Sequence, residues 1–418
     1  MVDIIFKILF FIMVGCIAYS YAGYPLVLLI MGLFRKREPV RPEQDLPSVA
    51  LIISAYNEER VIREKIENSL KLDYPRDRLR IIVASDGSVD ATNDIVREYE
   101  AHGVQLRAFE KREGKSATLN RSVLGIEEDI IVFSDANSFY REDALEKLVN
   151  GFSDTRVGCV VGRLIYIDNL SYVGRGEGIY WRYESFLNKL ESKLGSVLVA
   201  TGTIFAMRRE LFRPVMRDVA NDFQLPAEVA AQGYKIVYEP DAVAYEQSTY
   251  FCKEEFSRKR RIIVRGLTGY RHLRNSFGGS FRTYQFISRK LLRWWVGPML
   301  PALYLANIPL LGETPFFVIF LLQTLFYLFA AVGALLRRGV VRSRVFLVPF
   351  YFVIVNIASF AAIATYLAGH RLSSWEKAET TRDVDNGSPH QPHLKLIPGK
   401  KLSYGKADKE LENLERIT

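Results

Sequence analysis

A run of apolar residues in the middle of the chain ends on side chains that could hold a metal ion. Residues 130–140 read IIVFSDANSFY, so a strand-like segment leads into Asp135 and, two positions later, Asn137. Alternate residues of an extended segment point the same way, and hard divalent cations accept carboxylate and amide oxygens as ligands. A turn is the alternative, because Asp and Asn also stabilise turns by bonding to their own backbone. The pattern alone leaves both interpretations open.

Three further polar segments follow strand-like runs in the same part of the chain. They read SAYNE at 54–58, SDGSVD at 85–90 and REGKS at 112–116. The strand-like runs alternate with helical stretches, which is typical of a mainly parallel α/β sheet with right-handed crossovers. Ligands of such sheets bind beyond the carboxyl ends of the strands, so we expect these segments to share one site. Gly114 and Lys115 open a predicted helix that could hold phosphate, although no Walker motif is present.

Four long apolar runs lie outside this region, at residues 8–34, 291–312, 315–336 and 346–368. Each is long enough for one membrane-spanning helix of about 20 residues. Clusters of Lys and Arg at 35–37, 289–293 and 337–344 all fall on the cytoplasmic side if each run crosses once. We therefore expect one N-terminal and three C-terminal transmembrane helices, with the N-terminus outside and the central part of the chain in the cytoplasm.

The 418 residues divide on this basis into five parts. These are an N-terminal anchor (1–38), an α/β domain (39–250), a basic amphipathic segment (251–290), C-terminal transmembrane helices (291–369) and a tail (370–418). The tail has few large apolar residues and is predicted to be disordered. The three cysteines lie far apart and form no CxxC pair, so neither a disulfide framework nor a zinc site is indicated.

Positive charge is concentrated in residues 253–293, where twelve Lys or Arg stand against two Glu. Nucleic-acid binding is the usual interpretation of such a run. Here the interleaved apolar residues favour helices that lie on an anionic inner leaflet, so we expect a membrane and no nucleic acid as partner. Arg258, Arg261 and Arg265 recur at helical spacing, and we predict that Arg258 and Arg261 bind the phosphates of a donor or an acceptor.

The motifs SAYNEE, DGSVD, GKSATLN and DAN occur in an order that resembles the family-2 inverting glycosyltransferases of GT-A fold. The resemblance is to their membrane-bound branch, which includes bacterial polysaccharide synthases, and it covers roughly residues 47–266. It implies a nucleotide diphospho-sugar donor, usually a UDP-sugar. It also implies donor-binding roles for five residues, which are Tyr56, Glu58, Asp86, Lys115 and Asp135.

The same resemblance implies the remaining site residues. The family's DxD motif binds a divalent metal on the diphosphate, which implies Mg²⁺ or Mn²⁺ on Asp135 and Asn137. Because Asn137 brings no charge, we expect it to hold the cation less tightly than Asp. Residues 197–211 match the acceptor segment, so Thr201 and Gly202 would lie beside the acceptor sugar. Asp222 matches the general base, which takes a proton from the acceptor hydroxyl during single displacement with inversion.

One motif of the processive members is altered. They carry QxxRW where this chain has EFSRK at 255–259, so the acceptor-stacking tryptophan is missing there. We therefore expect a metal-dependent inverting glycosyltransferase of the bacterial inner membrane. Its acceptor would be membrane-associated, such as a polyprenyl-linked glycan or an exopolysaccharide. A processive synthase with coupled export and a nucleotide-binding pseudoenzyme subunit are the alternatives, and the sequence names neither the sugar nor the oligomeric state.

Overall fold

The computed structural model describes residues 2–35, 45–167, 172–249, 251–274, 277, 279–336 and 343–370. All of these belong to one compact unit, Met1–Arg382, while a second unit, Asp383–Thr418, lies outside them. The tail that we predicted to be disordered is therefore outside the described residues from 371 onward. So are residues 36–37 and 337–342, which carry much of two of the basic clusters used to predict the membrane orientation.

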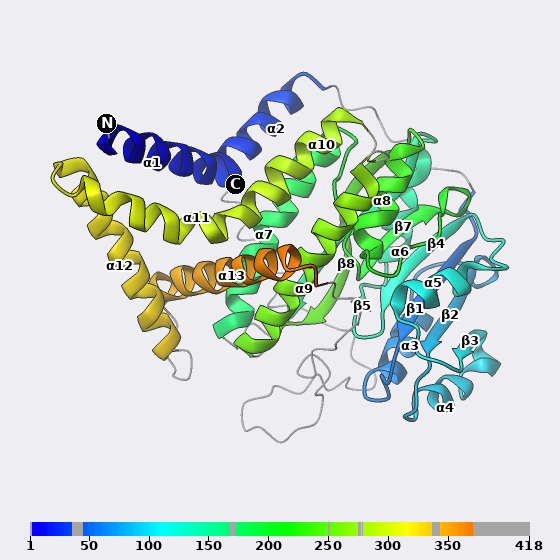
Figure 1. Cartoon of the computed structure of the whole chain (residues 1–418). Coiled ribbons are helices and arrows are strands. Elements are labelled where there is room, and N and C mark those ends of the chain that lie inside the picture. The colour runs from blue at the N-terminus through cyan, green and yellow to red at the C-terminus, as the bar shows by residue number, and fades with distance from the viewer. Residues whose placement is uncertain are drawn as a thin grey trace. The chain divides into compact units, whose positions relative to one another are not determined.

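Eight strands form one sheet in the order β3-β2-β1-β4-β7-β6-β8-β5 (Figure 1). The first four in that order are parallel throughout, and they are β3 (Val104–Phe109), β2 (Leu79–Asp86), β1 (Val49–Ala55) and β4 (Ile130–Asp135). The other four are mixed in direction, and they are β7 (Ile204–Arg208), β6 (Val157–Ile167), β8 (Lys235–Gln247) and β5 (Phe139–Tyr140). The predicted α/β fold with a mostly parallel sheet is confirmed.

The central strands are buried along almost their whole length because helices cover both faces of the sheet. All seven residues of β1 are buried, and five of the six in β4 are buried. The helices of this domain are α3 (Ile62–Leu70), α4 (Thr92–Arg97), α5 (Lys115–Val123), α6 (Ala144–Asn150), α7 (Tyr172–Lys193) and α8 (Asn221–Ala231). Because β1, β2 and β4 are parallel neighbours, the polar segments that follow them meet at one edge of the sheet.

The basic segment forms two helical stretches that pack into the protein. The first is α9 (Cys252–Leu273). The second is unbroken from α10 (Ser280–Phe286) through the π-helical turn η7 (Ile287–Leu291) and α11 (Leu292–Asn307) to the 3₁₀ turn Ile308–Leu310. Arg282 is 2% exposed and donates to the carbonyls of Val197 and Leu198 at 3.1 and 2.9 Å. Part of the segment that we expected on a membrane surface is thus an internal support of the catalytic domain.

Three helices are long and apolar enough to cross a membrane, at Asp3–Leu33, Thr314–Leu336 and Arg344–Leu367. The first contains α1 (Val2–Ala18), a π-helical turn (Tyr19–Gly23) and α2 (Tyr24–Leu33), and the others are α12 and α13. The run at 291–312, which we predicted as a further span, is not among these three helices. It forms the last part of the continuous helical stretch at 280–310, which contains α11.

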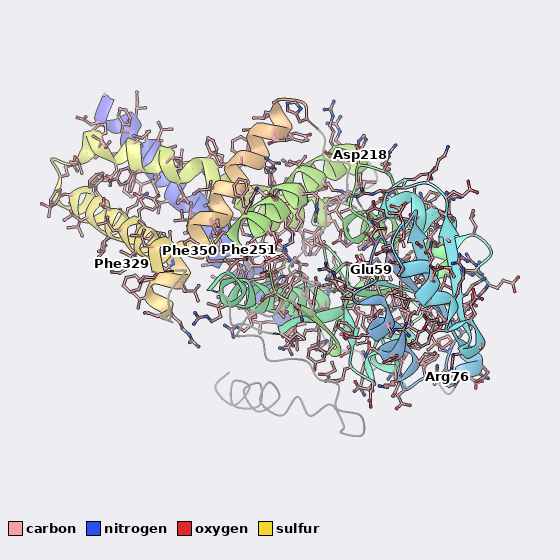
Figure 2. All side chains as sticks on the ribbon, turned by 90° about the horizontal axis from the view of Figure 1, so that it is seen from below. Glu59, Arg76, Asp218, Phe251, Phe329 and Phe350 are labelled. Atoms are coloured by element: carbon pink, nitrogen blue, oxygen red, sulfur yellow. The ribbon has the colours of Figure 1, made fainter. Side chains whose placement is uncertain are left out.

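The three apolar helices differ in how much protein covers them. Only 11% of the apolar window in Asp3–Leu33 and 17% of that in α12 is buried, against 50% in α13. A Cβ on Gly297 of α11 would lie 2.5 Å from the carbonyl oxygen of Asn356, and one on Gly333 of α12 would lie 2.6 Å from that of Phe346. Small residues therefore let both helices approach α13 closely. Figure 2 shows Phe329 and Phe350, which belong to α12 and α13.

Candidate active site

The loops after β1 and β2 are tied to each other by side-chain hydrogen bonds. Asn57 has a left-handed backbone with φ of 50°, and its backbone N–H donates to Oγ of Ser88 at 3.0 Å. The Val89 N–H donates back to Oδ1 of Asn57 at 2.8 Å. Asn is one of the few residues that adopts this conformation readily, which explains its place in the loop. The predicted donor-binding residue Tyr56 thereby gains a fixed position beside the second loop.

The three residues of these loops that we predicted to bind the donor have different surroundings. The Tyr56 ring is stacked by the guanidinium of Arg112, which is 4.0 Å from the ring centroid. The carboxylate of Asp86 is 2% exposed and accepts from the backbone N–H groups of Glu113 and Gly114 at 2.8 and 2.9 Å. A carboxylate has further lone pairs, so Asp86 can still accept from a ligand N–H. Glu58 is only 1% exposed, so its side chain lies deeper than we expect for a residue that contacts a ribose.

Lys115 and Asp135 meet at the ends of α5 and β4. Gly114 precedes α5 with φ of +93°, a conformation that glycine adopts without strain. Lys115 at the first position of the helix forms an ion pair with Oδ1 of Asp135, and both side chains are partly exposed. Their side chains thus bring one cation and one carboxylate to the edge of the sheet, where a diphosphate could bind both Lys115 and a metal on Asp135.

Asn137 lies two residues beyond Asp135 and is held by a carboxylate from β8. Its Nδ2 donates to Oε1 of Glu246 at 3.0 Å. An ionised carboxylate only accepts hydrogen bonds, so it must face the amide nitrogen, and the amide oxygen of Asn137 points the other way. Glu246 was not predicted from the sequence, because it lies 109 positions away in the chain.

The donor set at this edge fits a hard divalent cation. Mg²⁺ usually keeps several waters and is bound by one or two carboxylates together with substrate phosphates. Asp135 supplies a carboxylate and Asn137 an amide oxygen whose direction is set by Glu246. Among the described residues no cluster of three His, Cys, Asp or Glu is arranged to hold an ion. A cation at Asp135 and Asn137 would therefore take its other ligands from the diphosphate and from water.

A buried lysine supports the loop that carries Asp135 and Asn137. Lys65 of α3 is fully buried, donates from Nζ to the carbonyl of Ser138 at 2.5 Å and lies 4.1 Å from the centroid of the Tyr140 ring. Burial lowers the pKa of Lys65 to about 7, while the nearby charge of Asp135 raises it. Sequence reasoning missed Lys65, because in an amphipathic polar helix it looks like any solvent-facing lysine.

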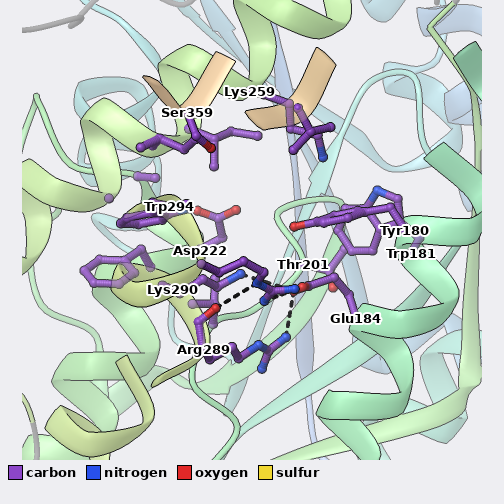
Figure 3. A pocket seen from close by; sticks show the side chains of 18 of the residues that line it. Tyr180, Trp181, Glu184, Thr201, Asp222, Lys259, Arg289, Lys290, Trp294 and Ser359 are labelled. Atoms are coloured by element: carbon purple, nitrogen blue, oxygen red, sulfur yellow. Dashed lines mark hydrogen bonds and ion pairs between the residues drawn. The ribbon is translucent and has the colours of Figure 1, made fainter. Parts of the chain in front are cut away.

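The residues that we predicted for catalysis and for acceptor binding line one cavity of about 540 Å³, which is seen in Figure 3. Asp222 lies in the first turn of α8, and a Cβ on Gly202 would be 3.2 Å from its Oδ2. Five of the predicted site residues line this cavity together, namely Lys115, Asp135, Thr201, Gly202 and Asp222, and Arg261 joins them from α9. The absence of a side chain at Gly202 leaves the Asp222 carboxylate open to a ligand in the cavity.

Burial raises the pKa of the Asp222 carboxyl above its ordinary value. Lys115, Arg265 and Lys290 oppose this effect with their positive charges, and Asp135 adds to it. A general base works best when its pKa is close to the working pH, so a raised pKa suits a carboxylate that must take up a proton.

Arg258 is the one predicted site residue on α9 that does not reach the cavity. Its guanidinium forms ion pairs with Glu177 of α7 and Glu255 of α9 and donates to the hydroxyl of Tyr166 at 3.0 Å. Both glutamates are almost fully buried, and Tyr351 of α13 donates to Glu255 at 2.7 Å. Arg258 therefore has the surroundings of a structural cation that joins α7, α9 and α13, and these distant partners could not be read from helical spacing.

The cavity has further lining residues that the sequence did not indicate. They come from α7, the turn η7 and α13, and they include Tyr180, Trp181, Glu184, Lys290, Val355 and Ser359. The two adjacent tryptophans at the start of α11 have separate surroundings. Trp294 lines the cavity and Trp295 is 40% exposed.

Most of the α/β domain matches a known protein family. The match is to the sequence model of glycosyl transferase family 2 and covers residues 50–215. Residues 50–215 are a glycosyltransferase family 2 domain. The match includes the motifs after β1, β2 and β4 as well as Thr201 and Gly202, so the resemblance noted from the sequence is confirmed. It ends before Asp222, and the assignment of that residue rests on its position beside Gly202.

Two curated proteins are similar in sequence to about half of this chain. The chain is 31% identical over 241 residues to the probable glycosyltransferase YdaM of Bacillus subtilis, covering 52% of this chain and 55% of the relative. It is 23% identical over 209 residues to the poly-beta-1,6-N-acetyl-D-glucosamine synthase of Staphylococcus epidermidis, covering 48% and 50%. The chain spans about half the length of the curated relatives it matches.

One solved structure resembles most of the chain. The mannosyltransferase PcManGT from Pyrobaculum calidifontis, solved in complex with GDP-Man and Mn²⁺, aligns with a TM-score of 0.64 at 22% identity. The alignment covers 86% of this chain and 99% of that one. At this identity the similarity shows the fold alone, which is the GT-A fold around which the catalytic domain is built.

Proposed function

We propose that the chain is a membrane-embedded, metal-dependent inverting glycosyltransferase. It moves a sugar from a nucleotide diphospho-sugar, a UDP-sugar in our proposal, to an acceptor associated with the membrane. The observation that carries this proposal is the shared cavity, in which Asp222 and Gly202 face the same space as Asp135 and Lys115. A base and a site for a diphosphate on two sides of one cavity are what a single displacement at an anomeric carbon requires.

The reaction follows from these positions. The acceptor hydroxyl attacks the anomeric carbon and gives its proton to Asp222, while the bond from that carbon to the diphosphate oxygen breaks with its electron pair on the oxygen. Lys115 stabilises the charge on the leaving diphosphate. A bound Mg²⁺ or Mn²⁺, held by Asp135 and Asn137, would supply a Lewis acid that neutralises the same charge. Attack from the side opposite the leaving group inverts the anomeric configuration.

The donor base would lie beyond the ends of β1 and β2. The stacked pair of Arg112 and Tyr56 offers a flat surface for a base, and Asp86 offers an acceptor for an N–H group. Uracil and guanine both carry such a group, and the similar structure from Pyrobaculum calidifontis contains GDP-Man. UDP and GDP donors must therefore be compared directly.

The orientation in the membrane is also proposed. Lys7 near the start of α1 forms an ion pair with Glu313 at 2.5 Å, so the N-terminus lies beside the turn between α11 and α12. This contact supports the expectation that both are on the outer side of a bacterial inner membrane and that the catalytic domain is cytoplasmic. Cysteine labelling of residue 7 in intact cells tests it, because only an outer residue reacts with an impermeant reagent.

The test of the reaction is a donor panel on the full chain in detergent, with UDP- and GDP-sugars and with Mn²⁺, Mg²⁺ or a chelator. We expect turnover of one donor, loss of turnover with the chelator, and an inverted anomeric configuration by NMR. A long polymer of one sugar would favour the processive synthase, which the named synthase activity of one relative supports. Tight nucleotide binding with no turnover of any donor would instead favour the pseudoenzyme.

A further inference from the structure

The cavity extends from the catalytic base to a helix that can cross a membrane. Asp222, Thr201 and Gly202 line one end, and Val348, Phe352, Val355 and Ser359 of α13 line another part of the wall. The residues of the proposed base pocket, Tyr56 and Asp86, do not line it. Since donor and acceptor must meet at Asp222, the space on the α13 side belongs to the acceptor.

This cavity carries an excess of positive charge. Its described lining contains seven basic residues, Lys115, Lys259, Arg261, Arg265, Arg289, Lys290 and Arg293, against the three acidic residues Asp135, Glu184 and Asp222. Glu184 alone accepts contacts from Arg289, Lys290 and Arg293 at 2.8, 3.1 and 2.8 Å. One carboxylate cannot neutralise three cations, and the second partner, Glu191, pairs with Arg289. The cluster therefore keeps unmatched positive charge beside Asp222 (Figure 3).

Arg265 of α9 adds a cation with unused hydrogen-bonding capacity. Its Nη2 donates to the carbonyl of Val219 at 2.7 Å, and its buried Nε has no hydrogen-bond partner in the described part of the chain. No ion pair of Arg265 is found there either. A buried donor without a partner costs free energy, which is recovered if an anionic ligand completes the site. The charge of Arg265 acts on Asp222, so such an anion would lie near the attacking hydroxyl.

We propose that the acceptor is a membrane lipid whose head group carries both a phosphate and a hydroxyl. Arg265 and Lys290 hold the phosphate, the hydroxyl lies at Asp222, and the apolar chain leaves along Val348, Phe352 and Val355 of α13. This inference rests on the proposed function, because it assigns the acceptor of the same reaction. A neutral soluble glycan would use the aromatic side chains of the cavity but would bring no anion to Arg265.

The reaction balances with such an acceptor. The head-group hydroxyl forms the new bond to the anomeric carbon, its proton passes to Asp222, and the nucleoside diphosphate leaves with the electron pair of the broken bond. The lipid phosphate keeps its charge and its bonds throughout, so its role is only to bind the lipid to the protein.

The proposal is tested by photo-crosslinking of the full chain in mixed micelles, without a sugar donor. The probes are phosphatidylglycerol and diacylglycerol that carry the same diazirine on one chain. Crosslinks are mapped by mass spectrometry, and labelling at Phe352 and Val355 is divided by labelling at Leu322 of α12, which is 61% exposed and reports bulk lipid. We expect a ratio about tenfold higher for phosphatidylglycerol, the effect of one hydrogen bond to a charged group.

Two pairs of variants sharpen this experiment. Arg265→Gln should lower the phosphatidylglycerol ratio to that of diacylglycerol, while Arg271→Gln, at an exposed position on the same helix, should leave it unchanged. Val355→Phe should lower the ratio by filling the chain path, while Ile357→Phe, on the exposed face of α13, should not. Because Val355→Phe leaves every charge in place, it tests the chain path even if Arg265→Gln fails to fold.

Several outcomes would overturn the proposal. Equal ratios for the two lipids would remove the phosphate from the site. Loss of labelling with inorganic phosphate alone, without any difference between the lipids, would indicate a free-anion site. Protection by a soluble β-1,6-linked N-acetylglucosamine oligosaccharide, with no lipid preference, would indicate a glycan acceptor. UDP binding by calorimetry is measured in parallel, so that absent nucleotide binding with selective lipid labelling refutes the proposed function and not the lipid site.

Discussion

The loops at the sheet edge and the helix α9 both carry charged residues, but only in the loops does the sequence motif predict which of them meet. Asp135 follows β4 and Lys115 opens α5, and the two meet as expected. On α9, Arg258 and Arg265 look alike in the sequence, yet Arg258 is neutralised by Glu177 and Glu255 while Arg265 lines the cavity. A sheet fixes where strand ends meet, whereas the neighbours of a helical residue come from distant segments.

The largest effect is expected at the base. Asp222→Asn removes the proton acceptor but keeps the shape of the side chain, so turnover should fall by about 10²–10⁴. Nucleotide binding by calorimetry should not change. Asp218→Asn is the matched control, since Asp218 pairs with His272 and does not line the cavity. Full turnover of Asp222→Asn would show that the assignment of the base from the motif is wrong.

The second effect concerns stability and tests the structural role of Arg258. Although burial alone would raise it, the cations Arg258 and Lys259 hold the pKa of Glu255 at about 2. Arg258→Met leaves two buried carboxylates without their main cation, which should cost about 3–5 kcal/mol of unfolding free energy. Thermal unfolding in detergent measures it, with Arg271→Met as an exposed control on the same helix. If stability is kept and donor affinity drops, Arg258 is a ligand-binding residue after all.

A third, smaller effect concerns the metal. Asn137→Asp adds a charged ligand and should tighten Mn²⁺ binding in the presence of UDP on the order of tenfold, measured by calorimetry. The new carboxylate would face Glu246, whose Oε1 now accepts from Asn137 at 3.0 Å. The double variant Asn137→Asp, Glu246→Gln removes that repulsion and should bind Mn²⁺ at least as well. Weaker binding in both variants would mean that Asn137 shapes the turn and does not ligate.

The smallest effect is a shift in pH dependence. The carboxylate of Asp222 must be deprotonated to act, so turnover falls as the pH drops through its pKa. Burial raises that pKa and Lys115 opposes the rise, so Lys115→Met should raise it further and move the acid limb of kcat to higher pH. A pH profile at saturating donor measures the shift, with the exposed Lys71→Met as control. An acid limb that stays in place would separate Lys115 from the base.

The sequence was sufficient to predict the parallel half of the sheet, because strands that are buried on both faces have continuous apolar runs in the sequence. The structure brings Asp222 and Gly202 together, and their roles stay predictions. The sequence could not supply Lys65 or Glu246, since both depend on contacts across more than 70 positions. The sequence also did not predict that the run at 291–312 is the end of a longer helical stretch whose first part is held inside the protein.

The half-buried position of α13 has a practical consequence for work with fragments. A fragment that ends before Arg344 keeps the strands and loops of the donor side but lacks the part of the cavity wall that Val348 and Val355 form. Water would then fill that side and compete as nucleophile. Such a fragment is expected to split its donor without glycosylating anything, and its behaviour should not be taken as the behaviour of the intact enzyme.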